Sequence, residues 1–463
     1  MAGTVSSLGI GSSVLTADVI DKLKANDTAN MITPIDKKIT TQAQKASALD
    51  LLSSLLSSFK SNASTLADDT LYQKRNVSGN NDAVSVTALS GSDIQSFSVT
   101  DTVMAKKGIL ESGSFSSETA KISSGSGTMS LSVDGSNFNI SYTNTTSLLD
   151  LRDSINTAAG AKVTASILQT GASEYHLVLT SKETGANQNV TLSDSVGGTM
   201  NNELKAYDAS TNPTGIQSIQ TGSDATFKYN GITITRASNS VDDLVVGVTI
   251  NLLQSGGSAN IGISQNTAAI SNEVKNLATS YNTLIKQLDD MTLSDLTNGK
   301  VGIFNGDNTI KAIKREVTKM MTSMDSKGQS LAQYGVGLTQ AGVMTFTQSE
   351  FDAKMSADPT ALEAFFSGST SASGTYTEGV FGNLNALMDS YTGSGGLMST
   401  LTEASKNETT ALNTERARSS ALLTARYDTM TARFAAYDSI ISKLNNQFSS
   451  LQQQISAMSN SSN

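Results

Sequence analysis

The longest regular pattern of apolar positions lies near the C-terminus of the chain. Between residues 423 and 458, large apolar and aromatic residues recur at alternating gaps of four and three. This is the a/d heptad pattern of a helix that packs along one face against other helices. No Gly or Pro interrupts it, so we expect one helix of roughly 54 Å at 1.5 Å per residue. The positions of this pattern, which we call the C-terminal seam, are Leu423, Tyr427, Met430, Phe434, Tyr437, Ile441, Leu444, Phe448, Leu451, Ile455 and Met458.

A seam this apolar must be covered by another helix, and the sequence leaves the partner open. Burying it would gain on the order of 20 kcal/mol before opposing terms are counted. For the upper half, a hairpin within one chain and a contact between subunits have equal support. For the lower half a contact between subunits is favoured, because little other sequence remains to cover it. The flanking positions change from Arg426 and Arg433 to Asn445, Gln447, Gln452 and Gln454, so charge does little to select the partner in the last two heptads.

The N-terminal part of the chain offers a second helical segment over residues 36–68. It contains no Gly or Pro, and Pro34 before it is expected to start or kink the helix. Its apolar face is predicted to hold Leu52, Leu55, Phe59 and Leu66. The small residues that we expect to receive the aromatic side chains of the C-terminal seam are Ala43, Ala46, Ala48 and Ala63.

Three shorter segments also have helical spacing. Val19, Ile20 and Leu23 predict a short amphipathic helix after Gly9-Ile10-Gly11. A second uninterrupted heptad seam is formed by Ile270, Val274, Leu277, Tyr281, Leu284, Leu288 and Met291. A third, shorter seam is formed by Ile310, Ile313, Val317, Met320 and Met324. The main helices are therefore expected near 36–68, 267–291, 308–325 and 400–459.

In the middle of the chain the helical spacing gives way to alternation of apolar and polar residues, which is the pattern of half-buried strands. Residues 131–133 and 138–142 flank Asp134-Gly135, and Asn230-Gly231 lies at the centre of 226–235. Both dipeptides favour tight β-hairpin turns. Further strand candidates are 84–87, 97–99, 162–168, 175–179 and 245–253.

These patterns predict an α+β multidomain fold. Helical segments from both chain ends would form a terminal coiled-coil stem and a helical bundle. Two β-rich domains would be inserted between them, over residues 76–266. The Ser- and Gly-rich segment at 108–127 is expected to mark the entry to an outer β domain, and residues 212–222 are expected to mark its exit.

Composition narrows the chemistry that the chain can perform. The 463 residues carry a net charge of −9, which disfavours binding to nucleic-acid backbones. The chain has no Cys, which excludes disulfides and thiolate sites, and one His, which excludes a zinc site with two imidazoles from one chain. Because Tyr175, Leu177 and Leu179 alternate around it, His176 is interpreted as a half-exposed strand residue. We predict no catalytic residues, no metal site and no cofactor, and therefore no enzyme.

The sequence also bears on membranes and export. The longest apolar stretch, 244–253, is interrupted by Gly247, Thr249 and Asn251, and it is too short to span a bilayer. Residues 1–10 lack the basic and apolar regions of a cleaved secretory signal. We expect a chain that does not insert into membranes, and that is either soluble or exported by a route that uses no cleaved signal.

Several segments, taken in order, resemble the bacterial flagellar filament cap family, also called hook-associated protein 2. Residues 7–12 (SLGIGS) followed by Pro34-Ile35 are similar to its N-terminus, and 148–156 (LLDLRDSIN), 177–181 and Thr184-Gly185 resemble a motif shared by flagellins and caps. Residues 281–284 resemble a helix start of the family. Residues 334–338 with Gly342, Phe351 and Leu362 resemble a hairpin segment in which Ala341 stands where an Asp is usual. Arg426-Tyr427, Phe434 and Leu444-Asn445 match the C-terminal signature, so the resemblance covers nearly the whole chain.

The resemblance implies a layout in four parts. Terminal legs (D0) are expected from residues 1–40 and 435–463, and a helical bundle (D1) from 41–75 and 267–434. Two β-rich domains follow, D2 from 76–106 and 217–266 and the outer D3 from 107–216. The residues expected to make assembly contacts are the C-terminal seam and, in the N-terminal leg, Leu8, Ile10, Val19, Ile20 and Leu23.

The resemblance also implies a structural role at the distal tip of the flagellar filament. The chain would be secreted and form an extracellular homo-oligomeric ring, expected as a pentamer, that promotes flagellin folding and polymerisation and prevents flagellin loss. Its implied partners are flagellin, the hook-filament junction protein and an export chaperone at the C-terminus, with no nucleic acid and no membrane. The alternative is a filament-forming flagellin-like or junction protein, because these share terminal helices around β domains. A secondary role in adhesion is expected for a surface-displayed outer domain.

Overall fold

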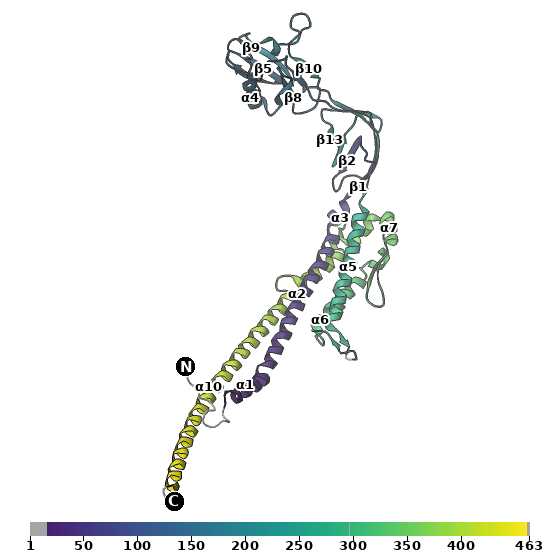
Figure 1. Ribbon diagram of the computed structural model, residues 1–463. Helices are drawn as coiled ribbons and strands as arrows, with labels where there is room; N and C mark the ends of the chain where they lie inside the picture. The colour runs from purple at the N-terminus through teal and green to yellow at the C-terminus, as the bar shows by residue number, and fades with distance from the viewer. Residues whose placement is uncertain (1–15, 296, 461–463) are drawn as a thin grey trace. The chain divides into compact units, whose positions relative to one another are not determined.

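The computed structural model describes residues 16–295 and 297–460, and these divide into two compact units (Figure 1). The helical unit contains the described parts of Met1–Asp69 and Ile270–Asn463. The β unit is Thr70–Ala269. The predicted fold class is therefore confirmed, with helices from both chain ends and a β-rich insertion between them.

The helical unit is built mainly from long helices near the two ends of the chain. Its helices are α1 (Ala17–Met31), α2 (Thr33–Ala67), α5 (Thr267–Thr292), α6 (Asn308–Thr322), α7 (Gln348–Ala357), α8 (Pro359–Phe366), α9 (Val380–Thr392) and α10 (Leu397–Asn460). Three short hairpins connect them: β16 (Ser294–Asp295) with β17 (Lys300–Val301), β18 (Val336–Leu338) with β19 (Met344–Phe346), and β20 (Gly368–Thr370) with β21 (Tyr376–Glu378). A short helix, α3 (Asp69–Gln73), lies where the two units meet in sequence.

Helix α2 and helix α5 each bury one heptad face in the helical unit. The second predicted seam, from Ile270 to Met291, is buried along its whole length, and Tyr281 meets Phe59 of α2 with ring centroids 6.0 Å apart. Pro34 lies in the first turn of α2, as predicted. The prediction that Leu55 lies on the buried face of α2 is wrong, since Leu56 is buried in its place. One residue turns a helix by about 100°, and only the 4-3 spacing keeps the buried positions on one face.

Two other predictions in the helical unit need correction. The third seam ends earlier than expected, because α6 stops at Thr322; Met321 is buried instead of Met320, and Met324 is 70% exposed. The segment likened to a helix start lies in the middle of α5. There the Asn282 side chain exchanges two hydrogen bonds with the backbone of Met344, at 2.9 and 2.7 Å, and so holds the β18–β19 hairpin against α5.

The β unit consists of four sheets, one α-helix of its own and a 3₁₀ helix at Asn202–Leu204. Its strands are β1 (Arg75–Ser78), β2 (Val84–Ala88), β3 (Gln95–Val103), β4 (Ile109–Glu111), β5 (Gly127–Val133), β6 (Ser136–Tyr142), β7 (Val163–Gly171), β8 (Glu174–Ser181), β9 (Thr191–Val196), β10 (Gln217–Gln220), β11 (Ala225–Tyr229), β12 (Ile232–Arg236), β13 (Ser240–Val245), β14 (Val248–Leu252) and β15 (Ala259–Gln265). The sheet orders are β1-β15-β3-β11-β12, β13-β14-β2, β10-β4-β8-β7 and β6-β5-β9. Every pairing of these strands is antiparallel.

Both predicted hairpins are present, and the backbone conformation of their turn residues explains why they form. Asp134 and Asn230 have φ of 48° and 49°, and the glycine after each also has a positive φ. Two successive left-handed residues match the twist of a two-residue hairpin. The single strand predicted over 245–253 is wrong, because Val246-Gly247 makes a turn there and Val245 pairs with Val248. Gly247 has φ 72°, a conformation that favours glycine.

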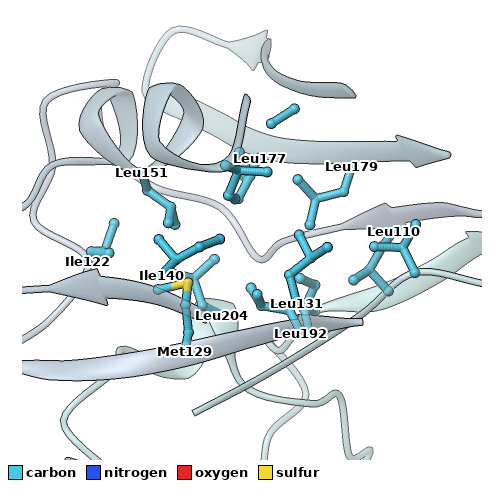
Figure 2. Close-up of a cluster of buried hydrophobic side chains, with 14 of the residues drawn as sticks. Leu110, Ile122, Met129, Leu131, Ile140, Leu151, Leu177, Leu179, Leu192 and Leu204 are labelled. Carbon is cyan, nitrogen blue, oxygen red and sulfur yellow. The ribbon is translucent and has the colours of Figure 1, made fainter. Parts of the chain in front are cut away.

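The β unit contains two separate hydrophobic cores. The first β core is drawn from residues 84–105 and 225–263, and it includes Phe97, Phe227 and Ile250. The second β core is drawn from residues 110–216, and Figure 2 shows Met129, Ile140 and Leu177 converging in it. Two β-rich bodies were predicted, and each of these cores has two of the sheets around it.

The second β core also contains a helix that the alternation pattern did not predict. Helix α4 (Leu148–Ala159) buries Leu148, Leu151 and Ile155. Ser147 and Asp150 form a capping box at its N-terminus: the Asp150 N–H donates to the Ser147 hydroxyl, and the Ser147 N–H donates to the Asp150 carboxylate. Such a box satisfies backbone donors that the first helical turn leaves open, so a local signal for this helix was present in the sequence.

Candidate assembly surface on the C-terminal helix

The C-terminal seam lies on one continuous helix. Helix α10 runs from Leu397 to Asn460 without a break, which confirms the single helix predicted from the heptad spacing. The seam nevertheless has two parts with different surroundings. We call Leu423, Tyr427, Met430 and Phe434 the upper seam, and we call Ile441, Leu444, Phe448, Leu451, Ile455 and Met458 the lower seam.

The upper seam is covered by the same chain. Leu423 and Tyr427 are each 4% exposed, and they form a small core with Ile20 of α1 and Ile32. Met430 and Phe434 pack against this core and are partly buried. Of the two alternatives that the sequence left open for the upper half, the structure shows the intramolecular one.

One carboxylate joins α1 to α10 beside this core. Asp27 accepts a hydrogen bond from the Tyr427 hydroxyl at 2.9 Å, and it pairs with the Arg426 guanidinium at 3.0 Å. The Arg426 guanidinium also lies 5.9 Å from the centre of the Tyr427 ring. Burial raises the pKa of Tyr427 above its ordinary value, and the hydrogen bond to Asp27 raises it further. These contacts fix the register of α1 along the upper seam.

Helices α1 and α2 both run antiparallel to α10, and the same register continues from α1 into α2. Asp36 pairs with Arg416 of α10, and the Gln42 amide donates to the Ser405 hydroxyl at 2.8 Å and to its carbonyl at 3.1 Å. As the position rises from 27 to 36 to 42, its partner on α10 falls from 426 to 416 to 405. The start of α1 therefore lies toward the C-terminal end of α10.

The lower seam is exposed in the part of the chain that the structure describes. The exposed fraction is 52% at Leu444 and 76% at Phe448, and Leu451, Ile455 and Met458 fall between these values. Ile441 is only partly exposed, and Tyr437, which lies between the two parts of the seam, is 56% exposed. In Figure 1 the yellow end of α10 continues beyond α1. Large apolar side chains exposed together on one face of a helix form a contiguous apolar patch. Such patches are uncommon on protein surfaces and mark interaction sites.

The residues predicted to make assembly contacts in the N-terminal leg differ in their burial. Leu8 and Ile10 lie outside the described residues. Ile20 is buried against the upper seam, whereas Val19 and Leu23 are 37% and 44% exposed. The structure thus brings one of the three described leg residues to the seam.

The alanines of α2 do not receive the seam aromatics, and that expectation is wrong. Tyr427 and Phe434 pack with Ile20 of α1 and with Ile32 instead. The antiparallel register is the reason, because it places Gln42 of α2 beside Ser405, far along α10 from Tyr427. Ala63 is fully buried, but it belongs to the buried face of α2 that also carries Phe59.

Asp27 makes a contact that the heptad pattern did not predict. It follows Ile20 by seven residues, so both occupy the same heptad position on α1 and face the same way. A carboxylate at an otherwise apolar position, together with Arg and Tyr at 426 and 427, was the available signal.

The single histidine of the chain lies in the β unit. His176 lies on β8, where its Nδ1 is 2.9 Å from the Ser112 carbonyl and 3.6 Å from a Glu111 carboxylate oxygen. Within residues 16–295 and 297–460, no three His, Asp or Glu side chains gather as metal ligands. Over the same ranges, no helix combines the length and the apolarity needed to cross a bilayer.

Comparison with protein families identifies the type of protein that carries this surface. A family model described as the flagellar hook-associated protein 2 N-terminus matches residues 12–108, and its C-terminal counterpart matches residues 222–446. The chain belongs to the flagellar hook-associated protein 2 family. A further model, the flagellin hook IN motif, matches residues 128–183, which include α4 and the β7–β8 pair. The resemblance found in the sequence is confirmed, and these matches do not favour the flagellin-like or junction alternative.

Individual relatives agree with this membership. Flagellar hook-associated protein 2 of Campylobacter jejuni is 31% identical over 80% of this chain and 65% of its own length. The Escherichia coli protein of the same name is 25% identical over 99% of both chains. This chain spans less than two thirds of the first of these relatives, and 38% of the Helicobacter pylori protein, which is 33% identical over the matched part.

A solved structure shares the fold. The crystal structure of the D1-D2-D3 domains of the flagellar cap protein from Escherichia coli superposes with a TM-score of 0.61. It covers 78% of this chain and 99% of the solved chain at 23% identity. The fold of this chain is therefore that of the hook-associated protein 2 family.

Proposed function

We propose that this chain caps the distal tip of a bacterial flagellar filament. In this role it forms a homo-oligomeric ring that promotes flagellin folding and polymerisation and prevents loss of flagellin. Membership of the hook-associated protein 2 family supports the role. The observation that carries it is the lower seam, whose apolar side chains lie exposed beyond the intramolecular pairing with α1.

The proposed mechanism is helix docking by the lower seam. Residues 435–463 and the N-terminal residues act as the D0 legs, and the rest divides into D1, D2 and D3 at the boundaries predicted from the sequence. Between residues 439 and 463 the only charged side chain is Lys443. A leg with so little charge can dock into several non-equivalent gaps at a growing helical tip, because charge does not select one of them.

The remaining partners follow from the same role. The ring is expected to be a pentamer, and it would contact flagellin and the hook-filament junction protein. An export chaperone is expected to cover the C-terminal segment before secretion, since an apolar lower seam would otherwise promote aggregation. The chain would then act outside the cell, at the filament tip.

The test replaces the lower seam without shortening the helix. Leu444, Phe448, Leu451 and Ile455 are changed together to Ser in the full chain, and the matched control changes Asn446, Ser449, Gln453 and Ser456 on other faces of α10 to Ala. We expect the seam variant to be exported but to leave cells non-motile, with flagellin lost to the medium. The control variant should support swimming. Normal motility of an exported seam variant would rule out the proposed docking.

A second measurement addresses the ring. Light scattering of the purified full chain should give a bounded mass, because a closed ring stops growing whereas a filament does not. Mass that rises without limit as concentration rises would favour the filament-forming alternative. A monomer at high concentration would contradict both.

A further inference from the structure

The two β cores are joined by a narrow two-stranded link. Residues 104–108 lead from the first β core to the second, and residues 221–224 lead back. Lys106 and Ser223 exchange backbone hydrogen bonds at 2.8 and 3.2 Å. On the first-core side, the Asn239 amide exchanges hydrogen bonds with the backbone of Ala105, at 2.7 and 3.0 Å. A two-stranded ribbon by itself can twist and bend, so it would not fix one core against the other.

A turn of the second β core closes onto this link. After β8, the Gly185 N–H donates to the Lys106 carbonyl at 3.1 Å. The backbone packs so closely that a Cβ on Gly222 would lie 2.5 Å from the Gly185 carbonyl oxygen, and a Cβ on Gly108 would lie 2.1 Å from the Gln188 carbonyl oxygen. Glycine at these positions allows the turn to lie directly against both link strands.

The same turn also reaches Ala237, at the edge of the first β core, and Asp224, at the end of the link. The Thr184 hydroxyl donates to the Ala237 carbonyl at 2.6 Å, and the Ala186 N–H donates to the Asp224 carboxylate at 2.7 Å. Gly185 lies between these two contacts with φ 131°, and a Cβ there would lie 2.9 Å from the Ala237 Cβ. Three consecutive residues of one core thus bond to the link and to the edge of the other core.

We propose that Thr184-Gly185-Ala186 is a clasp that locks the second β core against the first. The clasp adds a third line of contact to the two-stranded link, which removes rotation about the link as a free motion. Thr184-Gly185 was singled out in the sequence only as part of a resemblance, and the clasp gives this dipeptide a physical role. The proposal concerns the β unit alone and does not depend on the capping function.

A distance measurement across the two cores tests the clasp. Because the chain contains no Cys, Ser173→Cys in the second β core and Asp82→Cys in the first provide two unique spin-label sites, both at exposed positions. Pulsed electron spin resonance on the full chain then reports the distribution of distances between the labels. In the parent chain we expect one narrow distribution.

The clasp variant combines Thr184→Val with Asp224→Ala and removes both side-chain contacts. We expect its distance distribution to broaden about twofold, since a two-stranded link without other contacts allows domain motion. The matched control, Thr164→Val with Asp93→Ala, removes the same groups at exposed positions away from the link, and it should keep the parent width. An unchanged width in the clasp variant would overturn the proposal.

Two further variants guard against an effect of unfolding. Thr184→Val alone keeps the side-chain shape, and it should broaden the distribution by less than the double variant while α4 and the β11–β12 hairpin keep their amide protection. Gly185→Ala places a methyl group against Ala237 and should separate the cores by a shift in the mean distance. If Thr184→Val leaves the width unchanged and Gly185→Ala leaves the mean unchanged, the clasp does not exist.

Discussion

The upper and lower seam have the same heptad spacing on the same helix, yet their surroundings differ. Tyr427 in the upper seam is 4% exposed, whereas Phe448 in the lower seam is 76% exposed. The apolar pattern of α10 does not account for this difference, because it is equally regular in both parts. What differs is the element opposite, since Ile20 of α1 and Ile32, which follows α1, pack against the upper seam only.

The upper and lower seam also differ in the charged residues around them. Beside the upper seam, Arg426 and Arg416 pair with Asp27 and Asp36 of the N-terminal helices. Around the lower seam, charge is nearly absent from the sequence. An intramolecular contact has one fixed partner and can use charge to set its register, while a surface that docks at several sites gains from having none.

The largest effect is expected from a matched pair of truncations, one in the upper seam and one in the lower seam. Leu423→Ala should destabilise the α1–α10 contact by about 2–5 kcal/mol, because it opens a cavity in a buried site. Leu444→Ala removes the same atoms from an exposed site and should leave that contact unchanged. Hydrogen exchange of the α1 amides measures both. Equal loss of protection in the two variants would show that the seam is one uniform surface.

A smaller effect is expected at the carboxylate that ties α1 to α10. Asp27→Ala should weaken the α1–α10 contact by about 1–3 kcal/mol, since it leaves the Tyr427 hydroxyl and Arg426 without their acceptor. Asp21→Ala on the exposed side of α1 is the control. A double-mutant cycle with Tyr427→Phe, read by the same amide exchange, isolates the hydrogen bond. Additive effects would mean that Asp27 and Tyr427 do not interact in solution.

The ionisation of Tyr427 should make the upper contact sensitive to alkali. The folded state raises the pKa of Tyr427, so the folded state favours the neutral phenol. The stabilisation that the neutral Tyr427 phenol gives to the α1–α10 contact is therefore complete below the ordinary pKa of about 10. This stabilisation is lost as pH rises through the raised pKa. Protection of α1 should fall over this range in the parent chain and fall less in Tyr427→Phe. Identical profiles would contradict the assignment.

The smallest effect is expected from salt at the lower seam. Association through residues 441–458 should change little between about 0.05 and 0.5 M salt, because screening acts on charges and this segment has almost none. Sedimentation of the full chain measures this dependence, with the chain carrying the serine-substituted lower seam as the control for association elsewhere. A steep decrease of association with salt would show that a charged surface, and not the lower seam, holds the assembly together.

Much of the fold could be predicted from periodicity. The 4-3 spacing of α10 and α5, the Asp134-Gly135 and Asn230-Gly231 turns and the helical ends around a β-rich middle were all predicted from local pattern. The errors arose where local pattern is ambiguous. Val245 to Leu253 looks like one apolar run, and only the positive φ of Gly247 divides it. Leu148 to Ile155 has helical spacing within a β-rich region, and its Ser147 cap was the deciding signal.

The sequence by itself determined that α10 must present a long apolar face, because the spacing of large side chains along a helix leaves no other arrangement. It also determined that charge could not select a partner for the last heptads. Only the tertiary structure decided which half of that face is covered, because the answer depends on the direction and register of α1. Those are set by contacts such as Asp27 with Tyr427, between residues four hundred positions apart. The same holds for the clasp, where Thr184 and Ala237 become neighbours only after both β cores have folded.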